Sequence, residues 1–199
     1  PYGVTFDGVN LLTIDTTTDR IYKHDGFSST VLDSFSSPSS GAYGLTCWTD
    51  NIYSADFSAD FIYKHSGFTS IILDSFSSPT LIPDGLSFDG TDLYYTDDYS
   101  NAIYKHDGFS STILDSFSTP NNSPFGLSND LTHFYSSDYG VDNFFQHDGF
   151  SSTILDSFSS PSSFPRDVEW EARVPAGTTS STSSSTSSST SSSTSSSTS

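Results

Sequence analysis

Four histidines stand at equal intervals along the chain and are the first residues that suggest chemistry. Imidazole nitrogens bind zinc and carry protons in catalysis, so four of them could form a metal site. Residues related by a regular repeat lie in different copies of one structural unit, however, whereas a tetrahedral zinc site needs its ligands at one point. We therefore expect each histidine to pack or hydrogen-bond beside its own hairpin turn. The four are His24, His65, His106 and His147.

Aspartates gather in four short segments that recur in the same way. Carboxylate oxygens are the ligands that Ca²⁺ prefers, so a face carrying these segments could hold that ion. None of the segments follows a full D-x-D-x-D-G calcium loop, and the alternative is an acidic rim whose aspartates cap turns. No other cofactor is indicated. The candidate ligands are Asp15, Asp19, Asp56, Asp60, Asp97, Asp98, Asp138 and Asp142.

An active site lies at one place, so its residues should differ between the repeated segments. The single cysteine, Cys47, takes the place of Phe6 and Phe88, which indicates a small core residue and not a nucleophile. Neither a Ser-His-Asp arrangement nor a glycine-rich phosphate loop is evident. We therefore predict that the protein is not an enzyme. The unit-specific residues considered are Arg20, Cys47, His133, Gln146 and Arg166.

The recurrence has a period of 41 residues and continues through four copies without insertion or deletion. The openings PYGVTFDG, AYGLTCWT, PDGLSFDG and PFGLSNDL define units 1–41, 42–82, 83–123 and 124–164. A fifth opening, PRDVEWEA, begins at Pro165, so we expect an extra first strand over residues 165–172. Repeats of this length are the signature of stacked structural units.

Each unit predicts four β-strands. In unit 83–123 they are GLSF, DLYYTD, AIYKH and STILDSF. Asp-Gly pairs such as Asp7-Gly8 and Asp25-Gly26 supply the positive φ of tight hairpin turns. Four-stranded units in series are typical of propeller blades. We predict an all-β protein over residues 1–173, a β-propeller of four-stranded antiparallel blades, with an open solenoid as the main alternative.

Units such as PDGLSFDGTDLYYTDDYSNAIYKHDG resemble NHL-type repeats and the YWTD repeats of LDL-receptor-like propellers. The P-x-G-L opening and the LYYTD…N-IYKHDG middle carry the resemblance, which spans residues 1 to about 172. It implies a propeller and leaves the function open. Because those families usually close with more than four blades, the extra strand is expected to close the ring, to cap an open edge or to pair with another chain.

The charge excludes one class of partner. Six basic residues against 24 acidic ones give a net charge of −18. A chain of this charge would be repelled by phosphates, so we expect no nucleic acid as a partner.

No stretch approaches the roughly 20 apolar residues of a membrane helix, so we expect no membrane span. The chain lacks an initiator methionine and a signal peptide, and we expect a processed chain or a fragment.

Residues 174–199 form a Ser/Thr-rich stalk or linker, because the segment from Thr178 to Ser199 contains only serine and threonine. Such tracts are commonly O-glycosylated in secreted proteins. Asn121-Asn122-Ser123 is also an N-glycosylation sequon. The candidate attachment sites are Thr178, Thr179, Thr182, Thr186, Thr190, Thr194, Thr198, Ser183, Ser187, Ser191 and Asn121.

These observations favour an extracellular or cell-surface structural protein without catalytic activity. In this hypothesis the propeller is a bead on a glycosylated stem, and copies of the chain assemble into a fibril. The first alternative is a propeller that binds a glycan, a peptide or Ca²⁺ through its acidic loop face. The second is a hydrolase or lyase with a metal on the propeller axis.

Intact-mass measurement tests the stem. The unmodified chain has a mass of 21.5 kDa, and we expect a heterogeneous excess in hexose-sized steps on the native protein. Fragmentation of the peptide that follows Arg173 should map the excess to residues 178–199. A homogeneous mass of 21.5 kDa would leave the tract a plain linker.

Overall fold

The computed structural model describes residues 1–169 and folds them into four antiparallel sheets. Each sheet is a meander of four strands that are consecutive in the chain. Units 1–41 and 42–82 form β1 (Val4–Phe6), β2 (Leu11–Asp15), β3 (Arg20–His24), β4 (Val31–Ser36), β5 (Ala42–Trp48), β6 (Asn51–Asp56), β7 (Phe61–His65) and β8 (Ile72–Ser77). Units 83–123 and 124–164 form β9 (Pro83–Phe88), β10 (Leu93–Asp97), β11 (Ala102–His106), β12 (Ile113–Ser118), β13 (Pro124–Asn129), β14 (Phe134–Asp138), β15 (Asn143–His147) and β16 (Ile154–Ser159).

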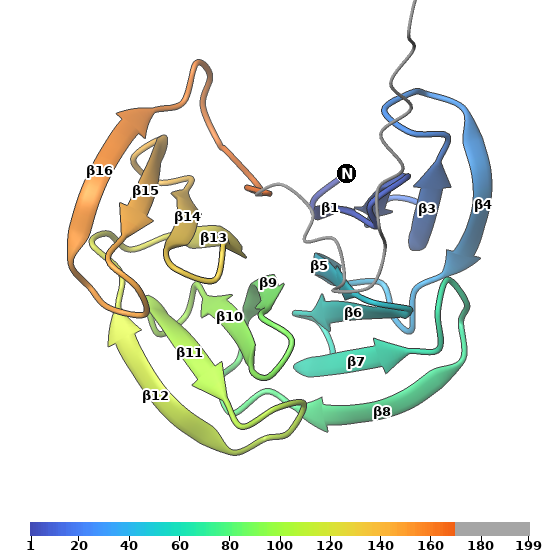
Figure 1. The fold of residues 1–199 in the computed structure, drawn as a ribbon, viewed down its shortest axis with the longest axis horizontal. Coiled ribbons are helices and arrows are strands. Elements are labelled where there is room, and N and C mark those ends of the chain that lie inside the picture. The colour runs from blue at the N-terminus through green and yellow to red at the C-terminus, as the bar shows by residue number, and fades with distance from the viewer. Residues whose placement is uncertain (170–199) are drawn as a thin grey trace, which may run out of the picture.

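The sheets stand around a common centre (Figure 1). β1, β5, β9 and β13 lie innermost, and β4, β8, β12 and β16 form the periphery. An opening separates β16 from the first sheet. The predicted all-β propeller of four blades is therefore confirmed. No helix among residues 1–169 is long and apolar enough to cross a membrane.

The hydrophobic core consists of layers between neighbouring sheets. The layer between the first and second sheets includes Ile14, Ile21 and Leu45, all buried. The next two layers are built in the same way, and the last of them contains Ile103 and Leu127. Neighbouring sheets cover the inner strands on both faces. The adjacent apolar residues of the outermost strands lie outside these layers, since Ile113 and Leu114 are 40% and 52% exposed.

The innermost strands touch backbone to backbone at the glycine in the third position of each unit. A Cβ at Gly44 would lie 1.9 Å from the carbonyl oxygen of Asp84, and one at Gly85 would lie 2.2 Å from that of Phe125. Only glycine permits such an approach. The repeated glycine therefore sets the distance between neighbouring blades at the centre of the ring.

Each histidine belongs to its own blade, as expected. The Nε2 atoms of His65 and His147 lie 2.9 Å from the hydroxyls of Ser54 and Ser136 in the adjacent strand. Burial lowers the pKa of both histidines to about 4, so their rings are neutral at neutral pH. The repeated histidines are thus structural residues of separate interfaces.

A fifth segment enters the centre of the ring after unit 124–164. Asp167 Oδ2 accepts a hydrogen bond from the Val4 amide at 2.5 Å, and Gly126 lies against the backbone of Asp167 and Val168. Residues 165–169 thus occupy the inner position that the expected extra strand would take, although they form no regular strand. Residues 170–172 of that strand and the stalk at 174–199 lie outside the described residues.

The backbone contact at the glycines predicts a sharp difference between two substitutions. Gly85→Ala should lower the free energy of unfolding by about 3 kcal/mol, because the new Cβ meets backbone that cannot move independently. Gly8→Ala should cost only about 1 kcal/mol, because Gly8 has φ +93° but open space around it. Denaturant unfolding of the two variants measures the difference. Equal losses would contradict the proposed contact.

Candidate functional site

Five side chains from equivalent positions meet on the axis of the propeller. They are the second residue of each unit, which precedes the glycine, and its counterpart in the fifth segment. Tyr2 and Phe125 come from the first and last units, yet their rings lie 6.0 Å apart, and Tyr43 lies 5.4 Å from Phe125. We call this set the axial ring. Its members are Tyr2, Tyr43, Asp84, Phe125 and Arg166.

Arg166 fixes the fifth segment to the ring by cation–π contacts. Its guanidinium carbon lies 4.8 Å from the ring centre of Tyr2, 5.0 Å from that of Phe125 and 5.5 Å from that of Tyr139. Arginine is well suited to such stacking, because its planar cation is weakly hydrated. The residue therefore ties the first and last units together.

A second set of equivalent residues surrounds the axial ring. It consists of the residue after each loop aspartate, and we call it the outer ring. Phe57 packs on Tyr43 at 4.3 Å, and Tyr139 packs on Phe125 at 5.8 Å between ring centres. Only unit 83–123 carries an acid in both sets. The outer ring comprises Thr16, Phe57, Asp98 and Tyr139.

The acidic pair Asp84 and Asp98 interrupts an otherwise aromatic collar. Asp84 is only 1% exposed, and within residues 1–169 neither of its carboxyl oxygens makes a hydrogen bond of good geometry, although the Asp98 amide and the Arg166 cation lie close enough to act against the rise of its pKa. Asp98 Oδ1 also lacks a partner there, whereas Oδ2 accepts a hydrogen bond from the Tyr139 hydroxyl at 3.3 Å. Buried polar atoms are nearly always paired in folded proteins. Three unpaired carboxyl oxygens at one point therefore mark the axial ring as the candidate site.

The electrostatics of the pair follow from its surroundings. Burial, together with the negative charges of Asp98 and Asp97, raises the pKa of Asp84 to about 9. Burial also raises the pKa of Asp98, to which the charges of Asp138 and Asp97 contribute. Asp84 is consequently protonated at neutral pH unless a cation replaces its proton.

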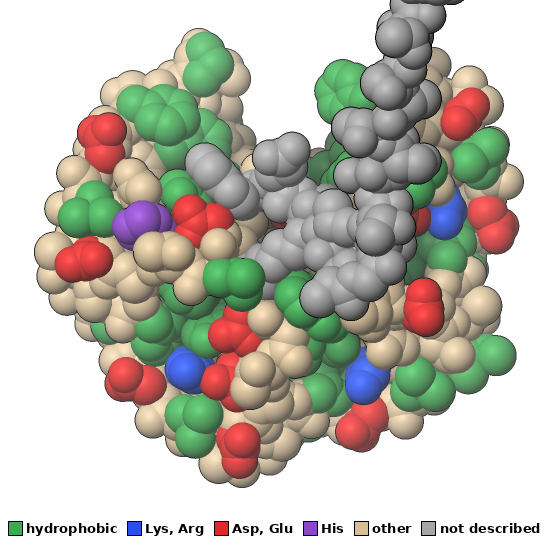
Figure 2. Space-filling model, in the orientation of Figure 1, with side chains coloured by type: hydrophobic (Ala, Val, Ile, Leu, Met, Phe, Trp, Pro, Cys, Tyr) green, Lys and Arg blue, Asp and Glu red, His purple; other side chains and the backbone are tan. Residues whose placement is uncertain are grey.

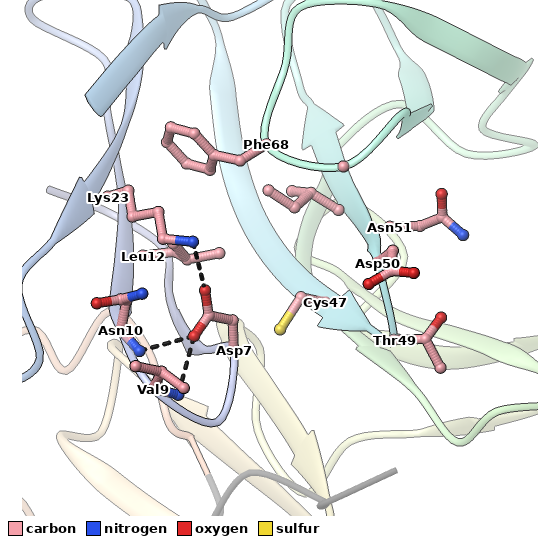
Figure 3. A pocket seen from close by; sticks show the side chains of 12 residues that line it. Asp7, Val9, Asn10, Leu12, Lys23, Cys47, Thr49, Asp50, Asn51 and Phe68 are labelled. Carbon is pink, nitrogen blue, oxygen red and sulfur yellow. Dashed lines mark hydrogen bonds and ion pairs between the residues drawn. The ribbon is translucent and has the colours of Figure 1, made fainter. Parts of the chain in front are cut away.

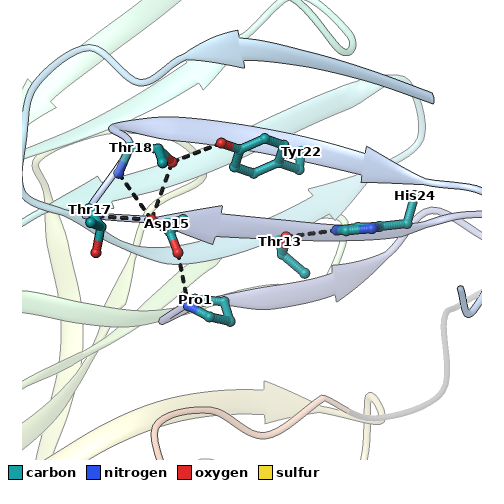
Figure 4. Close-up of polar contacts among 7 residues, drawn as sticks. All are labelled: Pro1, Thr13, Asp15, Thr17, Thr18, Tyr22 and His24. Atoms are coloured by element: carbon teal, nitrogen blue, oxygen red, sulfur yellow. Dashed lines mark hydrogen bonds and ion pairs between the residues drawn. The ribbon is translucent and has the colours of Figure 1, made fainter. Parts of the chain in front are cut away.

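The loop aspartates that the sequence suggested as Ca²⁺ ligands serve mainly as turn caps. Asp15 Oδ1 accepts the Thr17 and Thr18 amides at 2.9 and 3.0 Å (Figure 4). Asp56, Asp97 and Asp138 cap their own loops in the same way and hold the preceding connection with the second oxygen. Within residues 1–169, no cluster of three His, Cys, Asp or Glu side chains could hold a metal ion.

The second aspartate of three loops has a backbone role. Asp19, Asp60 and Asp142 have positive φ values of 52°, 56° and 55°, and Asn101 takes the same conformation in unit 83–123. Asp and Asn tolerate this left-handed region better than most residues do. Their carbonyl oxygens accept amides at the end of the outermost strand of the same sheet. Of the eight predicted ligands, Asp98 is the one that contributes to the axial site.

Apart from the axial ring, a cavity lies between the first and second sheets on the side of the hairpin turns (Figure 3). It measures about 370 Å³, because Leu12 and Cys47 stand where Tyr53 and Phe88 stack in the next interface. Burial raises the pKa of Cys47 to about 11, so its thiol stays protonated. Asp7 in this cavity is paired with Lys23 at 2.9 Å. Neither Cys47 nor Asp7 is therefore a free reactive group in this cavity.

The other unit-specific residues lie apart from the axis and make local contacts. Arg20 donates to the Ser34 carbonyl at 2.9 Å, and Gln146 donates to the Tyr135 hydroxyl at 3.4 Å. His133 Nδ1 is 3.5 Å from a carboxyl oxygen of Asp130 in a hairpin turn. Arg166 is the one of the five that reaches the axial ring.

Asn121 lies in the loop between β12 and β13, where its carbonyl accepts the Thr119 hydroxyl at 2.8 Å. The remaining predicted glycosylation sites, in the tract from Thr178 to Thr198, lie outside the described residues. The sequence reading missed Asp84. Its signal was the axial position itself, which changes among Tyr, Asp and Phe in the four units while the glycine after it stays constant.

The raised pKa of Asp84 predicts a pH-dependent effect of its removal. The folded pKa of about 9 exceeds the ordinary value of 3.8, so wild-type stability is complete below about pH 4 and falls as pH rises toward 9. Asp84→Asn does not ionise, so its melting temperature should match that of the wild type at pH 4 and exceed it by about 5 °C at pH 9. Asp60→Asn, which introduces the residue that unit 83–123 carries at the equivalent position, controls for the loss of one charge. A constant difference across this range would contradict the assignment.

No family model and no curated protein matches the sequence. Solved structures do match the fold. Myxococcus xanthus glutaminyl cyclase aligns with a TM-score of 0.68 at 13% identity, covering 79% of this chain and 69% of that one. A chain of the nidogen–laminin complex aligns at 0.63 and 20% identity, covering 84% and 66%. The computationally designed Ika8 protein aligns at 0.57 and 11%, covering 85% and 52%. At these identities the likeness concerns the fold alone, so this chain is similar to propellers of different kinds.

Proposed function

We propose that this protein is a non-catalytic binding module whose ligand is a small organic cation with a primary ammonium group. The observation that supports this is the Asp84–Asp98 pair, with three buried carboxyl oxygens that lack partners within residues 1–169. An ammonium group carries three donors and no acceptor, which matches three free acceptors. It would take the place of the proton that Asp84 holds at neutral pH.

The aromatic collar favours an organic cation over Ca²⁺. Calcium takes six to eight oxygen ligands, and the pair offers two carboxylates without a third acidic or histidine ligand within residues 1–169. Aromatic faces attract organic cations through their quadrupoles, and Tyr43 lies beside the pair. The net charge of −18 adds a long-range attraction for any cation.

A binding role without catalysis is supported by the state of the reactive groups. The Cys47 thiol is held protonated, and burial lowers the pKa of His65, His106 and His147, each of which directs at least one ring nitrogen to a hydroxyl or carbonyl group of its own blade. We further infer kinship with NHL- and YWTD-type repeats, for which the P-x-G-L and IYKHDG segments are the support.

A second candidate function is the extracellular or cell-surface bead on a glycosylated stem, assembled with copies of itself. Its support is the uninterrupted Ser/Thr tract from Thr178 to Ser199. The two roles are compatible, because a stem places a binding domain away from the surface that carries it.

Calorimetric titration of the full-length chain with n-butylammonium tests the proposal. We expect saturable binding with release of a proton at pH 7, because the cation displaces the proton of Asp84. Asp84→Asn should weaken binding at least tenfold, about 1.4 kcal/mol. Asp84→Tyr, which copies the residue at this position in unit 42–82, should abolish it.

Three controls distinguish the alternatives. Asp60→Asn removes an acid from the same loop face and should bind as the wild type does. Butanol has the same alkyl chain without charge and should not bind. Binding of CaCl₂ in preference to butylammonium, or wild-type affinity in Asp84→Asn, would overturn the proposal.

A further inference from the structure

One contact repeats at every interface between neighbouring sheets. A phenylalanine of the outermost strand packs on the histidine and on the turn phenylalanine of the next blade. Phe35 lies 5.4 Å from His65 and 4.9 Å from Phe68 between ring centres. Phe76 contacts His106 and Phe109 at 5.2 and 5.0 Å, and Phe117 contacts His147 and Phe150 at 5.3 and 5.0 Å. This three-ring contact is therefore the standard joint between blades.

In the part of the chain that the structure describes, the last sheet has the phenylalanine of this three-ring contact but no histidine and turn phenylalanine to pack on it. Phe158 is the fourth member of the phenylalanine series and is 65% exposed, whereas Phe35, Phe76 and Phe117 are half-buried. Phe144 stacks on it at 5.1 Å, in a position where the other units have fully buried isoleucines. A largely apolar pocket of about 330 Å³ extends from these rings to Val168.

The first sheet presents the complementary half across the opening. Phe27 is 94% exposed, although its equivalents Phe68, Phe109 and Phe150 all pack on a preceding blade. His24 keeps the hydrogen bond of its Nε2 to Thr13 at 3.0 Å but has no preceding phenylalanine. Figure 2 shows the surface notched between the two sheets.

The centre of the opening is already filled. Residues 165–169 pack on Gly126 and bind Val4, as the innermost strand of a further blade would do. A complete fifth sheet therefore lacks only the equivalents of its second, third and fourth strands. Both walls and the inner edge of a site for these three strands are present.

We propose that the opening binds a three-stranded antiparallel β-element that carries this repeat's own pattern, equivalent to β10–β12. Each wall of the opening carries one half of the three-ring contact that joins the blades at the three established interfaces. Exchange of the described strands between copies cannot fill the opening, because residues 1–169 provide five inner segments and only four outer triplets. The tract from Thr178 to Ser199 has no apolar side chains to cover Phe158, and the residues at 170–177 are too few for three strands. The occupant that we propose is therefore a separate polypeptide segment.

The test adds three strands to the protein in alignment with its 41-residue repeat. A copy of residues 91–123 is fused in front of Pro1 of the full chain, which reproduces the natural junction of Ser123 with Pro124. The extended chain should remain a monomer and melt about 10 °C higher than the parent, with weaker binding of a hydrophobic dye. Phe158→Asp in the extended chain should abolish most of this gain, while the same change in the parent should have little effect because Phe158 is exposed there.

A second measurement covers the case in which the fusion does not fold. A fluorescently labelled peptide of residues 91–123 should bind the full chain at a one-to-one ratio, and Phe158→Asp should remove the binding. An unchanged melting temperature in a folded extended chain, or equal peptide binding by wild type and Phe158→Asp, would overturn the proposal. So would a parent dimer that Phe158→Asp dissociates, because a second copy would then be the occupant.

Discussion

The close backbone contact between the innermost strands of neighbouring blades determines how the rest of the structure is arranged. Neighbouring blades approach at Gly44 and Gly85 until a single methyl group would not fit between them. That spacing forces the residue before each glycine toward a common axis and fixes the outer strands at a distance that three aromatic rings can span. The layered core between sheets is the consequence, because neighbouring sheets cover the inner strands of each blade. The convergence of the axial ring follows from the one glycine that each unit places at its third position.

Because the repeat is strict, residues with a structural role recur in every unit, whereas residues with a single specific role occur in one unit. Residues that recur, such as the histidines and the loop aspartates, find their partners within their own unit or the next. Among the residues that do not recur, those of the axial ring lie where the units converge, because only there can one side chain meet residues of several units. The pairing of Asp84 with Asp98 illustrates this point, since the two flanking units place aromatic residues at the same two positions.

The period, the strand order and the turn positions could be predicted from the sequence, because a repeat without insertions exposes its own alignment. The third strand, Ala102–His106, has the predicted bounds, whereas the first begins at Pro83, before the predicted GLSF. The acidic loops were recognised, but Asp97 and Asp98 could not be told apart. One caps its loop and the other turns to the axis, and that difference depends on backbone geometry. Asp84 could not be singled out, because the convergence of the residues before the glycines on one axis is visible only in the fold.

The hydrogen bond between Val4 and Asp167 joins residues 163 positions apart, whereas the strand pairing within each sheet joins neighbours in sequence. Blades can consequently form quickly and locally, in any order, and dock on the neighbour that the chain already holds close. The contact between Val4 and Asp167 forms only after all the blades, because closing such a long loop has the largest entropy cost. We therefore expect the contacts at Arg166 to form last during folding and to open first under mechanical load.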